Sequence, residues 1–225
     1  MRGVKTLWRS TVGMKILMAA TGILLVGFVV AHMAGNLKAF AGPESFNAYA
    51  EFLRDVGYPA VPHQGVLWIM RLGLLAAVGL HIWSAFSLTR SSQAARAIGY
   101  RKVSSQSFSY ASRTMRWGGV IILVFILYHL AHMTTGQLHP DFQHGEAYHN
   151  LVTGFQNRLV AGFYLLAVTM LAFHLYHGIW SMFQTLGANN PRYNRIRRPL
   201  AGIITAITLL GFVSVPIAIQ LGILS

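Results

Sequence analysis

Residues 16–32 read ILMAATGILLVGFVVAH, a run of apolar and small residues that carries no charge and ends on a histidine. About 20 such residues in a row are long enough to cross the hydrocarbon core of a bilayer as a helix. An imidazole is costly in that core, so a histidine there marks a candidate functional site. The stretch therefore predicts a membrane helix that carries a functional group, His32.

Four further stretches repeat this pattern. Hydrophobic residues make up 54% of the 225 residues and charged residues only 10%, which is typical of an integral membrane protein. The predicted spans cover residues 15–35, 66–88, 117–136, 158–186 and 200–222. We expect an all-α, multi-pass membrane protein with five transmembrane helices, in a single domain over residues 1–225. A signal peptide is the alternative for residues 1–42, but the apolar run is long enough to span and cleavage would discard His32.

Basic residues are distributed unevenly between the two predicted faces. Because successive spans alternate in direction, the N-terminus and the loops 89–116 and 187–199 share one face. That face carries the basic residues Arg2, Lys5, Arg9, Lys15, Arg90, Arg96, Arg101, Lys102, Arg113, Arg116, Arg192, Arg195, Arg197 and Arg198 and no acidic residue. All the acidic residues fall on the other face: Glu44, Glu51, Asp55, Asp141 and Glu146. The positive-inside rule then predicts a cytoplasmic N-terminus. The basic face suits a soluble protein partner or anionic lipid headgroups, and this distribution argues against a nucleic-acid ligand.

One histidine lies inside each of the first four spans: His32, His81, His129 and His174. At ~1.5 Å per residue, His32 lies about 25 Å and His129 about 20 Å above the cytoplasmic starts of their helices. Spans two and four run the other way, and His81 and His174 lie about 22 and 25 Å from their outer starts. Depth therefore pairs His32 with His129 in the outer half of the membrane and His81 with His174 in the inner half.

Two pairs of neutral ligands inside a helix bundle fit two haems with bis-histidine ligation. The chain has no cysteine, which excludes thiolate-ligated haem, covalent c-type attachment and Cys-ligated iron–sulfur clusters. We therefore expect the first four helices to form a haem-binding bundle with two haem b, in a cytochrome that passes electrons between a soluble partner and a lipid-soluble carrier. Small residues would leave room for porphyrin, although ordinary close packing of membrane helices explains them at least as well: Gly22, Gly27, Gly73, Gly79 and Gly162.

Depth alone does not choose between His129 and His132, which are three residues apart in span three. His177 lies close to the inner interface, so His174 is the better ligand candidate in span four. The remaining histidines fall in predicted loops and are expected to be solvated: His63, His139, His144 and His149. Residues 44–55 have their apolar side chains at helical spacing and predict a short amphipathic helix at the membrane interface.

An ordered set of motifs covers most of the chain. It comprises His32-Met-Ala-Gly-Asn36, His81-Ile-Trp-Ser-Ala-Phe-Ser-Leu-Thr89, Tyr128-His129-Leu-Ala-His132, and Gly162-Phe-Tyr164 followed by Phe173-His174 and Gly178-Ile-Trp-Ser181. The set resembles the membrane-anchor cytochrome b of succinate dehydrogenases and fumarate reductases, in the single-polypeptide, five-helix, dihaem form. The resemblance implies that the first histidine of the span-three doublet is the ligand. This gives His32 and His129 for the outer haem, and His81 and His174 for the inner haem.

The resemblance also implies partners and a substrate. A flavoprotein and an iron–sulfur subunit would bind the cytoplasmic face of this chain in a bacterial inner membrane, and a quinone, often menaquinone, would be the membrane substrate. The chain would act as the membrane subunit of a succinate:quinone oxidoreductase, without a succinate or flavin site of its own. A carboxylate near the outer haem would handle quinone protons, and Glu51 is the candidate because it follows His32 on the interfacial segment.

Two other classes of protein fit some of these patterns. One is the cytochrome b subunit of a hydrogenase, formate dehydrogenase or nitrate reductase, which copurifying subunits would distinguish. The other is a histidine-rich transporter or proton channel, which would lack the visible spectrum of haem. A membrane di-iron enzyme fits less well, since it would require denser histidine motifs or carboxylates in the spans.

Overall fold

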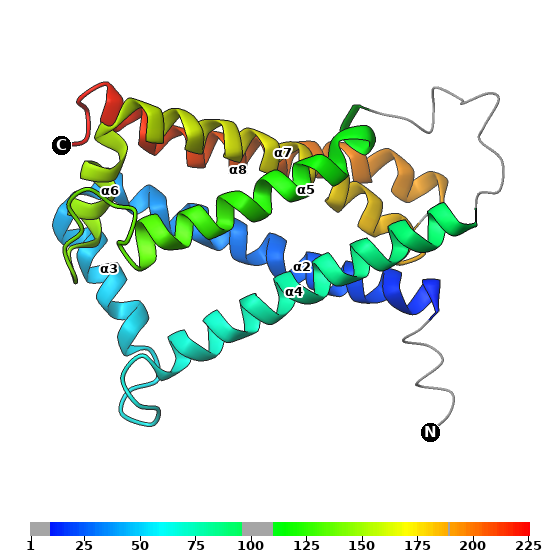
Figure 1. Cartoon of the computed structure of the whole chain (residues 1–225), viewed down its shortest axis with the longest axis horizontal. Coiled ribbons are helices and arrows are strands. Elements are labelled where there is room, and N and C mark those ends of the chain that lie inside the picture. The colour runs from blue at the N-terminus through cyan, green and yellow to red at the C-terminus, as the bar shows by residue number, and fades with distance from the viewer. Residues whose placement is uncertain (1–9, 96–109, 189) are drawn as a thin grey trace.

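The computed structural model describes residues 10–95, 110–188 and 190–225, and long helices dominate it (Figure 1). The long helices are α2 (Thr11–Asn36), α4 (Gly65–Ala94), α5 (Tyr110–His129), α7 (Arg158–Thr185) and α8 (Pro191–Gln220). Among the described residues, five helices are long and apolar enough to cross a membrane, α5 together with the turn that follows it. The predicted all-α membrane fold with five spanning helices is confirmed.

Polar side chains cap the starts of three spanning helices. Gly13 N donates to Ser10 Oγ over 3.0 Å where α2 begins, and Asn157 and Asn190 accept backbone N–H groups where α7 and α8 begin. Such caps satisfy donors that the first turn of a helix leaves without a partner. These caps fix where each apolar run enters the helical conformation.

The fifth span begins earlier than the sequence predicts. We expected the fifth span to cover residues 200–222, whereas α8 starts at Pro191 and contains Pro199 in its interior. Asn190 supplies the cap, and Pro191 takes the first-turn position in which a missing N–H costs nothing. The polar segment 191–199 therefore extends the membrane helix instead of forming a loop.

Shorter elements connect the spans at one end of the molecule. They are the 3₁₀ turn η1 (Leu37–Ala41), α3 (Pro43–Asp55), the π-helical turn η2 (Leu130–Thr134) and α6 (Ala147–Gln156). The amphipathic helix predicted over 44–55 is confirmed as α3. The segment 147–156 was expected to be loop, but it forms α6, whose apolar side packs against α7 and α8.

The two ends of the helix bundle differ in charge, since one end has exposed basic residues and no acidic residue among those described, whereas the other end has both. The start of α2 and the end of α7 lie at one end, and α3, α6 and the C-terminus lie at the other (Figure 1). The basic end has the exposed residues Lys15, Arg90, Arg116, Arg192, Arg195 and Arg198, while the acidic end has Glu44, Glu51, Asp55, Asp141 and Glu146. The remaining predicted members Arg2, Lys5, Arg9, Arg96, Arg101 and Lys102, and the side chain of Arg113, lie outside the described residues.

The spanning helices pack in a defined order. α2 packs along α4, α5 along α7, and α7 along α8, and α2 also contacts α7 and α8. The helices that carry each predicted histidine pair, α2 with α5 and α4 with α7, are not among these packed neighbours. Each histidine pair therefore joins helices across a diagonal of the bundle.

Large apolar side chains cover the outside of the helices. On α4 they include Trp68, Ile69, Leu72 and Leu75, and on α5 Val120, Ile121, Val124 and Leu127, all of them exposed. A soluble protein rarely presents so continuous an apolar surface, whereas a bilayer requires one. The histidines of these helices lie on other faces, where each contacts a histidine of another helix.

Candidate functional site

The first histidine pair lies toward the acidic end, between α2 and α5. The imidazole rings of His32 and His129 face each other with their centroids 5.8 Å apart and their planes at 77°. Phe28, one turn before His32, stacks on its ring at 5.3 Å, and Phe125 contacts the His129 ring at 5.7 Å with the two planes tilted by 30°. The outer pair predicted from helix depth is thus brought together among aromatic side chains.

The second pair lies nearer the basic end, between α4 and α7. His81 and His174 have their ring centroids 6.2 Å apart and their planes at 61°. Each ring belongs to a different helix of a bundle diagonal, as in the first pair. The structure therefore brings together all four predicted ligand candidates, in the pairs that depth predicted.

The spacing of both pairs suits a shared metal ion. Two imidazoles that bind one metal through nitrogens at ~2 Å hold their ring centres about 6 Å apart. Both pairs have this separation, and neutral imidazole nitrogen is the donor that haem iron takes in bis-histidine cytochromes. The residues present therefore fit two haems.

Glycines along these helices leave open space. A Cβ added at Gly27, Gly73, Gly79 or Gly162 would meet no atom within 4 Å among the described residues. Close helix packing, which we considered the simpler explanation for these glycines, does not account for them in this structure. Gly22 differs, since its added Cβ would lie 3.6 Å from the ring of His81. All four of these glycines are exposed, so the open space lies on the outer surface of the helices and is not specific to the histidine pairs.

The π-helical turn separates the two histidines of the span-three doublet. Thr135 N donates to Leu130 O over 2.9 Å, a bond that spans one residue more than an α-helix allows. His129 ends the regular helix and faces His32, whereas His132 lies within the turn, is fully buried, and stacks on His139 at 4.9 Å. The geometry therefore separates His132 from the outer pair.

His139 is buried, contrary to our expectation that it would be solvated. Helix α6 covers it, and His139 Nε2 donates to Asn150 O over 2.8 Å while Asp141 N donates to His139 Nδ1 over 3.1 Å. An added Cβ on Gly154 of α6 would lie 2.9 Å from the His132 ring and 3.0 Å from His139. The expectation was wrong because the sequence pattern did not reveal α6.

The other loop histidines remain at the surface. His63 and His144 are exposed, and His149 donates to Asp141 Oδ2 over 2.8 Å at a partly exposed position. None of these three side chains contacts a histidine of either pair in the described part of the chain.

Two buried hydroxyl groups contact the paired histidines, and sequence reasoning missed both. Thr21 Oγ1 lies 3.1 Å from His81 Nδ1, and Tyr164 Oη lies 3.3 Å from His129 Nδ1 and 3.0 Å from His132 Nδ1. Tyr164 belongs to the Gly162-Phe-Tyr164 motif, but the motif alone assigned it no role. Thr21 sits eleven residues before His32, about three helical turns, with nothing in its own neighbourhood to single it out.

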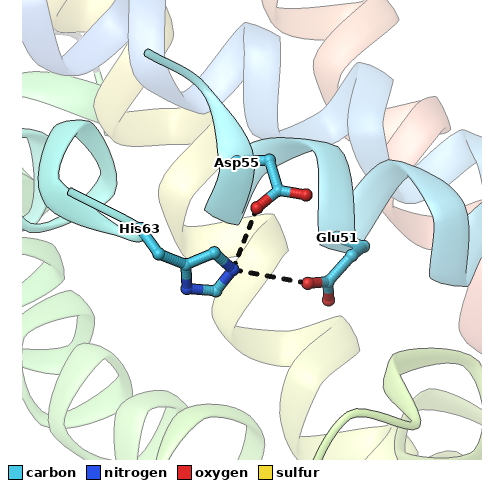
Figure 2. Close-up of side chains that lie close together, drawn as sticks. All are labelled: Glu51, Asp55 and His63. Atoms are coloured by element: carbon cyan, nitrogen blue, oxygen red, sulfur yellow. Dashed lines mark ion pairs between the residues drawn. The ribbon is translucent and has the colours of Figure 1, made fainter. Parts of the chain in front are cut away.

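Glu51 lies in an exposed charged cluster on α3 (Figure 2). Arg54 donates to Glu51 Oε2 over 2.7 Å, and His63 Nε2 lies 2.9 Å from Asp55 Oδ1 and 3.6 Å from Glu51 Oε1. The hydrogen bond from Arg54 holds the pKa of Glu51 below its ordinary value, and His63 acts in the same direction. Glu51 is therefore a carboxylate at neutral pH.

At the basic end, two arginines and a histidine surround one tryptophan ring. Arg197 and Arg198 lie over the ring of Trp180 at 5.5 and 5.3 Å, and His177 contacts the same ring at 5.5 Å. Arg197 is 8% exposed, so it is a packed residue of α8 and not a member of the accessible basic surface. His177 is thus part of this aromatic cluster, one turn beyond His174.

Fold and site together define an integral membrane protein whose central helices carry two facing histidine pairs. Residues 94–215, more than half of the chain, match the family described as Succinate dehydrogenase/Fumarate reductase transmembrane subunit, and the chain belongs to that family. It is 24% identical over 199 residues to the succinate dehydrogenase cytochrome b558 subunit of Bacillus subtilis (strain 168), a match that covers 86% of each chain. No solved structure matches it.

The family membership confirms the resemblance drawn from the sequence motifs. The chain is a multi-pass membrane subunit of the succinate dehydrogenase and fumarate reductase family, of the cytochrome b kind. The family is not that of the hydrogenase, formate dehydrogenase or nitrate reductase cytochromes considered above, nor that of a transporter.

Proposed function

We propose that this chain is the dihaem anchor of a succinate:quinone oxidoreductase and carries electrons between an iron–sulfur subunit at its basic end and quinone at its acidic end. One observation carries the proposal: the bundle holds two histidine pairs at different depths, and within each pair the two rings face each other. His32 and His129 would hold the outer haem, and His81 and His174 the inner haem. Haem at each pair would supply one-electron transfer.

The separation of the two pairs supports a transmembrane route. Helix α2 carries His32 of the first pair and Thr21, whose hydroxyl contacts His81 of the second pair. Eleven residues of helix separate these two positions, which places the pairs roughly 16 Å apart along the helix axis. Two centres so spaced cover much of a ~30 Å hydrocarbon core. The chain would form a single transmembrane domain around them.

The charge at the ends supports an orientation. The basic end would face the cytoplasm by the positive-inside rule, so the N-terminus would be cytoplasmic in a bacterial inner membrane. There the exposed arginines Arg192, Arg195 and Arg198 would attract the flavoprotein and iron–sulfur subunits as well as anionic lipid headgroups. The flavin and dicarboxylate sites would belong to those subunits.

Quinone, menaquinone in this proposal, would bind near the outer pair. Helix α3 follows the acidic end of α2 directly, and the Tyr49 ring of α3 lies against Gly35, three residues after His32. Glu51 lies on this same short helix as an exposed carboxylate. Quinone chemistry moves protons together with electrons, and Glu51 would exchange those protons with the outer aqueous phase.

The test is haem stoichiometry in the intact complex. Purified from its native membrane, the complex should contain two b haems per copy of this chain by pyridine haemochrome assay, together with flavoprotein and iron–sulfur subunits. A single haem per chain would contradict the two-pair assignment. Copurification with hydrogenase, formate dehydrogenase or nitrate reductase subunits would contradict the proposed complex.

A further inference from the structure

The two hydroxyl groups beside the histidine pairs follow a common arrangement. Helices α2 and α4 pack together, and Thr21 of α2 contacts His81 of α4. Helices α5 and α7 also pack together, and Tyr164 of α7 contacts His129 of α5. In both cases the hydroxyl meets Nδ1 of the imidazole and leaves Nε2 for the opposite side of the ring. Thr21 and Tyr164 are 7% and 5% exposed, so water does not replace either contact.

The hydrogen-bond partners of Thr21 determine the proton position on His81. The Thr21 hydroxyl donates its one hydrogen to Leu17 O over 2.8 Å, one helical turn earlier. Its oxygen therefore has only acceptor capacity left for His81 Nδ1 at 3.1 Å. His81 must then carry its proton on Nδ1 and present an unprotonated Nε2. This is the tautomer that a metal ligand through Nε2 requires.

Tyr164 stands between two histidines with one hydrogen to give. Its oxygen is closer to His132 Nδ1, at 3.0 Å, than to His129 Nδ1, at 3.3 Å. If His129 binds iron through Nε2, its proton lies on Nδ1 and is donated to Tyr164, and Tyr164 donates in turn to His132. His132 then carries a buried Nε2–H that has no partner among the described residues. His132 thus completes a three-residue chain, His129 to Tyr164 to His132.

We propose that Thr21 and Tyr164 are positioning residues for the haem ligands His81 and His129, and that each lowers the reduction potential of the haem beside it. The inference rests on the proposed dihaem function. An acceptor for the Nδ1 proton holds the ring orientation and makes the imidazole a stronger electron donor, which favours oxidised iron. His132 acts through Tyr164 by fixing the direction in which the hydroxyl donates.

Each hydroxyl contacts the histidine of a different pair. The two hydroxyl groups also differ in the acceptor to which they donate their own hydrogen. Thr21 gives its hydrogen to a backbone carbonyl, whereas Tyr164 gives it to an imidazole that is itself stacked on His139. Removing one hydroxyl should therefore change one haem and leave the other unchanged. A side chain that only fills space would not show such selectivity.

The experiment is a spectroelectrochemical titration of the whole complex in membranes. Two midpoint potentials are first assigned to the centres with His174→Ala, which should remove the inner haem. Tyr164→Phe should then shift the outer midpoint upward with the inner one unchanged, and Thr21→Val should shift only the inner midpoint upward. The matched controls are Tyr128→Phe, whose ring packs beside Tyr164, and Thr208→Val, whose hydroxyl donates to Ile204 O in α8. Neither control should move a midpoint.

Each outcome decides between the inference and its alternatives. Unchanged midpoints in both variants, or equal shifts of both haems, overturn the positioning role. If Tyr164→Phe loses the outer haem entirely, Thr21→Val decides: a shift of the inner midpoint alone supports the inference, and no shift overturns it. Fewer than two haems in the unmutated complex would contradict the proposed function itself, before any variant is compared.

Discussion

The guanidinium group of Arg197 lies over the indole ring of Trp180 at 5.5 Å, within the packed basic end of the bundle. Its neighbour Arg195, two residues earlier on the same helix, is exposed. Alternate arginines of one short segment therefore have different roles. Arg195 can face a partner, whereas Arg197 packs α8 against Trp180 of α7.

Charge reversal should separate these two roles. Arg192→Glu combined with Arg195→Glu should weaken binding of the soluble subunits several-fold and more strongly at low salt, because both side chains lie on the exposed basic surface. Haem content should stay the same. Copurification from membranes, compared at two salt concentrations, measures this. Unaltered recovery of the soluble subunits would show that they bind elsewhere.

Arg197→Glu should behave differently from its neighbours. It places a carboxylate in a buried site against Trp180, and an uncompensated buried charge costs about 3–5 kcal/mol. The expected result is a lower thermal unfolding temperature in detergent and a disturbed spectrum of the inner haem. If Arg197→Glu only weakened subunit binding and left stability unchanged, the packed role assigned to Arg197 would be wrong.

An alanine substitution at any of the four paired histidines should remove one haem, the same haem for both members of a pair. His32→Ala or His129→Ala should abolish the outer haem alone, and His81→Ala or His174→Ala the inner haem alone, since each haem loses one of its two ligands. Difference spectra of membranes give the result. His132→Ala is the matched control and should retain both haems. Loss of the outer haem in His132→Ala but not in His129→Ala would reverse the assignment.

Glu51→Gln tests the proton role at the quinone site. The substitution keeps the size of the side chain and removes its titration, so quinone-linked turnover should fall by about 100-fold, a typical contribution of a general acid or base. Haem spectra and electron transfer from the soluble subunits to an artificial dye should persist. Glu44→Gln, in the first turn of the same helix, is the control. Wild-type quinone turnover in Glu51→Gln would leave Glu51 as a surface residue only.

Gly154→Ala tests the packing that encloses His132. The added methyl group would lie 2.9 Å from the His132 ring, 3.0 Å from His139 and 3.1 Å from Met133, all buried or partly buried. Overpacking of this kind costs about 1–3 kcal/mol. The unfolding temperature should fall, whereas Gly202→Ala, which meets open space, should leave it unchanged or raise it. Equal stability of the two variants would show that the rings around Gly154 adjust freely.

Helix depth predicts which histidines meet because it depends only on a constant rise per residue and on alternating spans. The same argument could not choose between His129 and His132, because three residues change depth by only about 4.5 Å. The choice lies in the π-helical turn, a local widening that no apolar periodicity records. The family resemblance supplied that assignment before the structure showed which ring faces His32.

The contacts of the Thr21 and Tyr164 hydroxyl groups with the histidines could not be predicted from the sequence for a different reason. Threonine in a membrane helix ordinarily bonds its own backbone, as Thr21 does with Leu17, so its residue type did not indicate a second contact. The burial of His139 depended on α6, and the start of α8 depended on the cap by Asn190. Each of these features arises from contacts between segments far apart in the chain or from a single cap.

Helices α2 and α7 each contribute to both centres: α2 supplies His32 to one and Thr21 to the other, and α7 supplies His174 to one and Tyr164 to the other. Occupation of either centre therefore restrains two helices that the other centre also uses. The entropy lost in ordering α2 and α7 is lost only once, so the second haem should bind to a bundle that is already arranged. Assembly of this protein is expected to be cooperative, with chains carrying a single haem rarer during maturation than independent binding would produce.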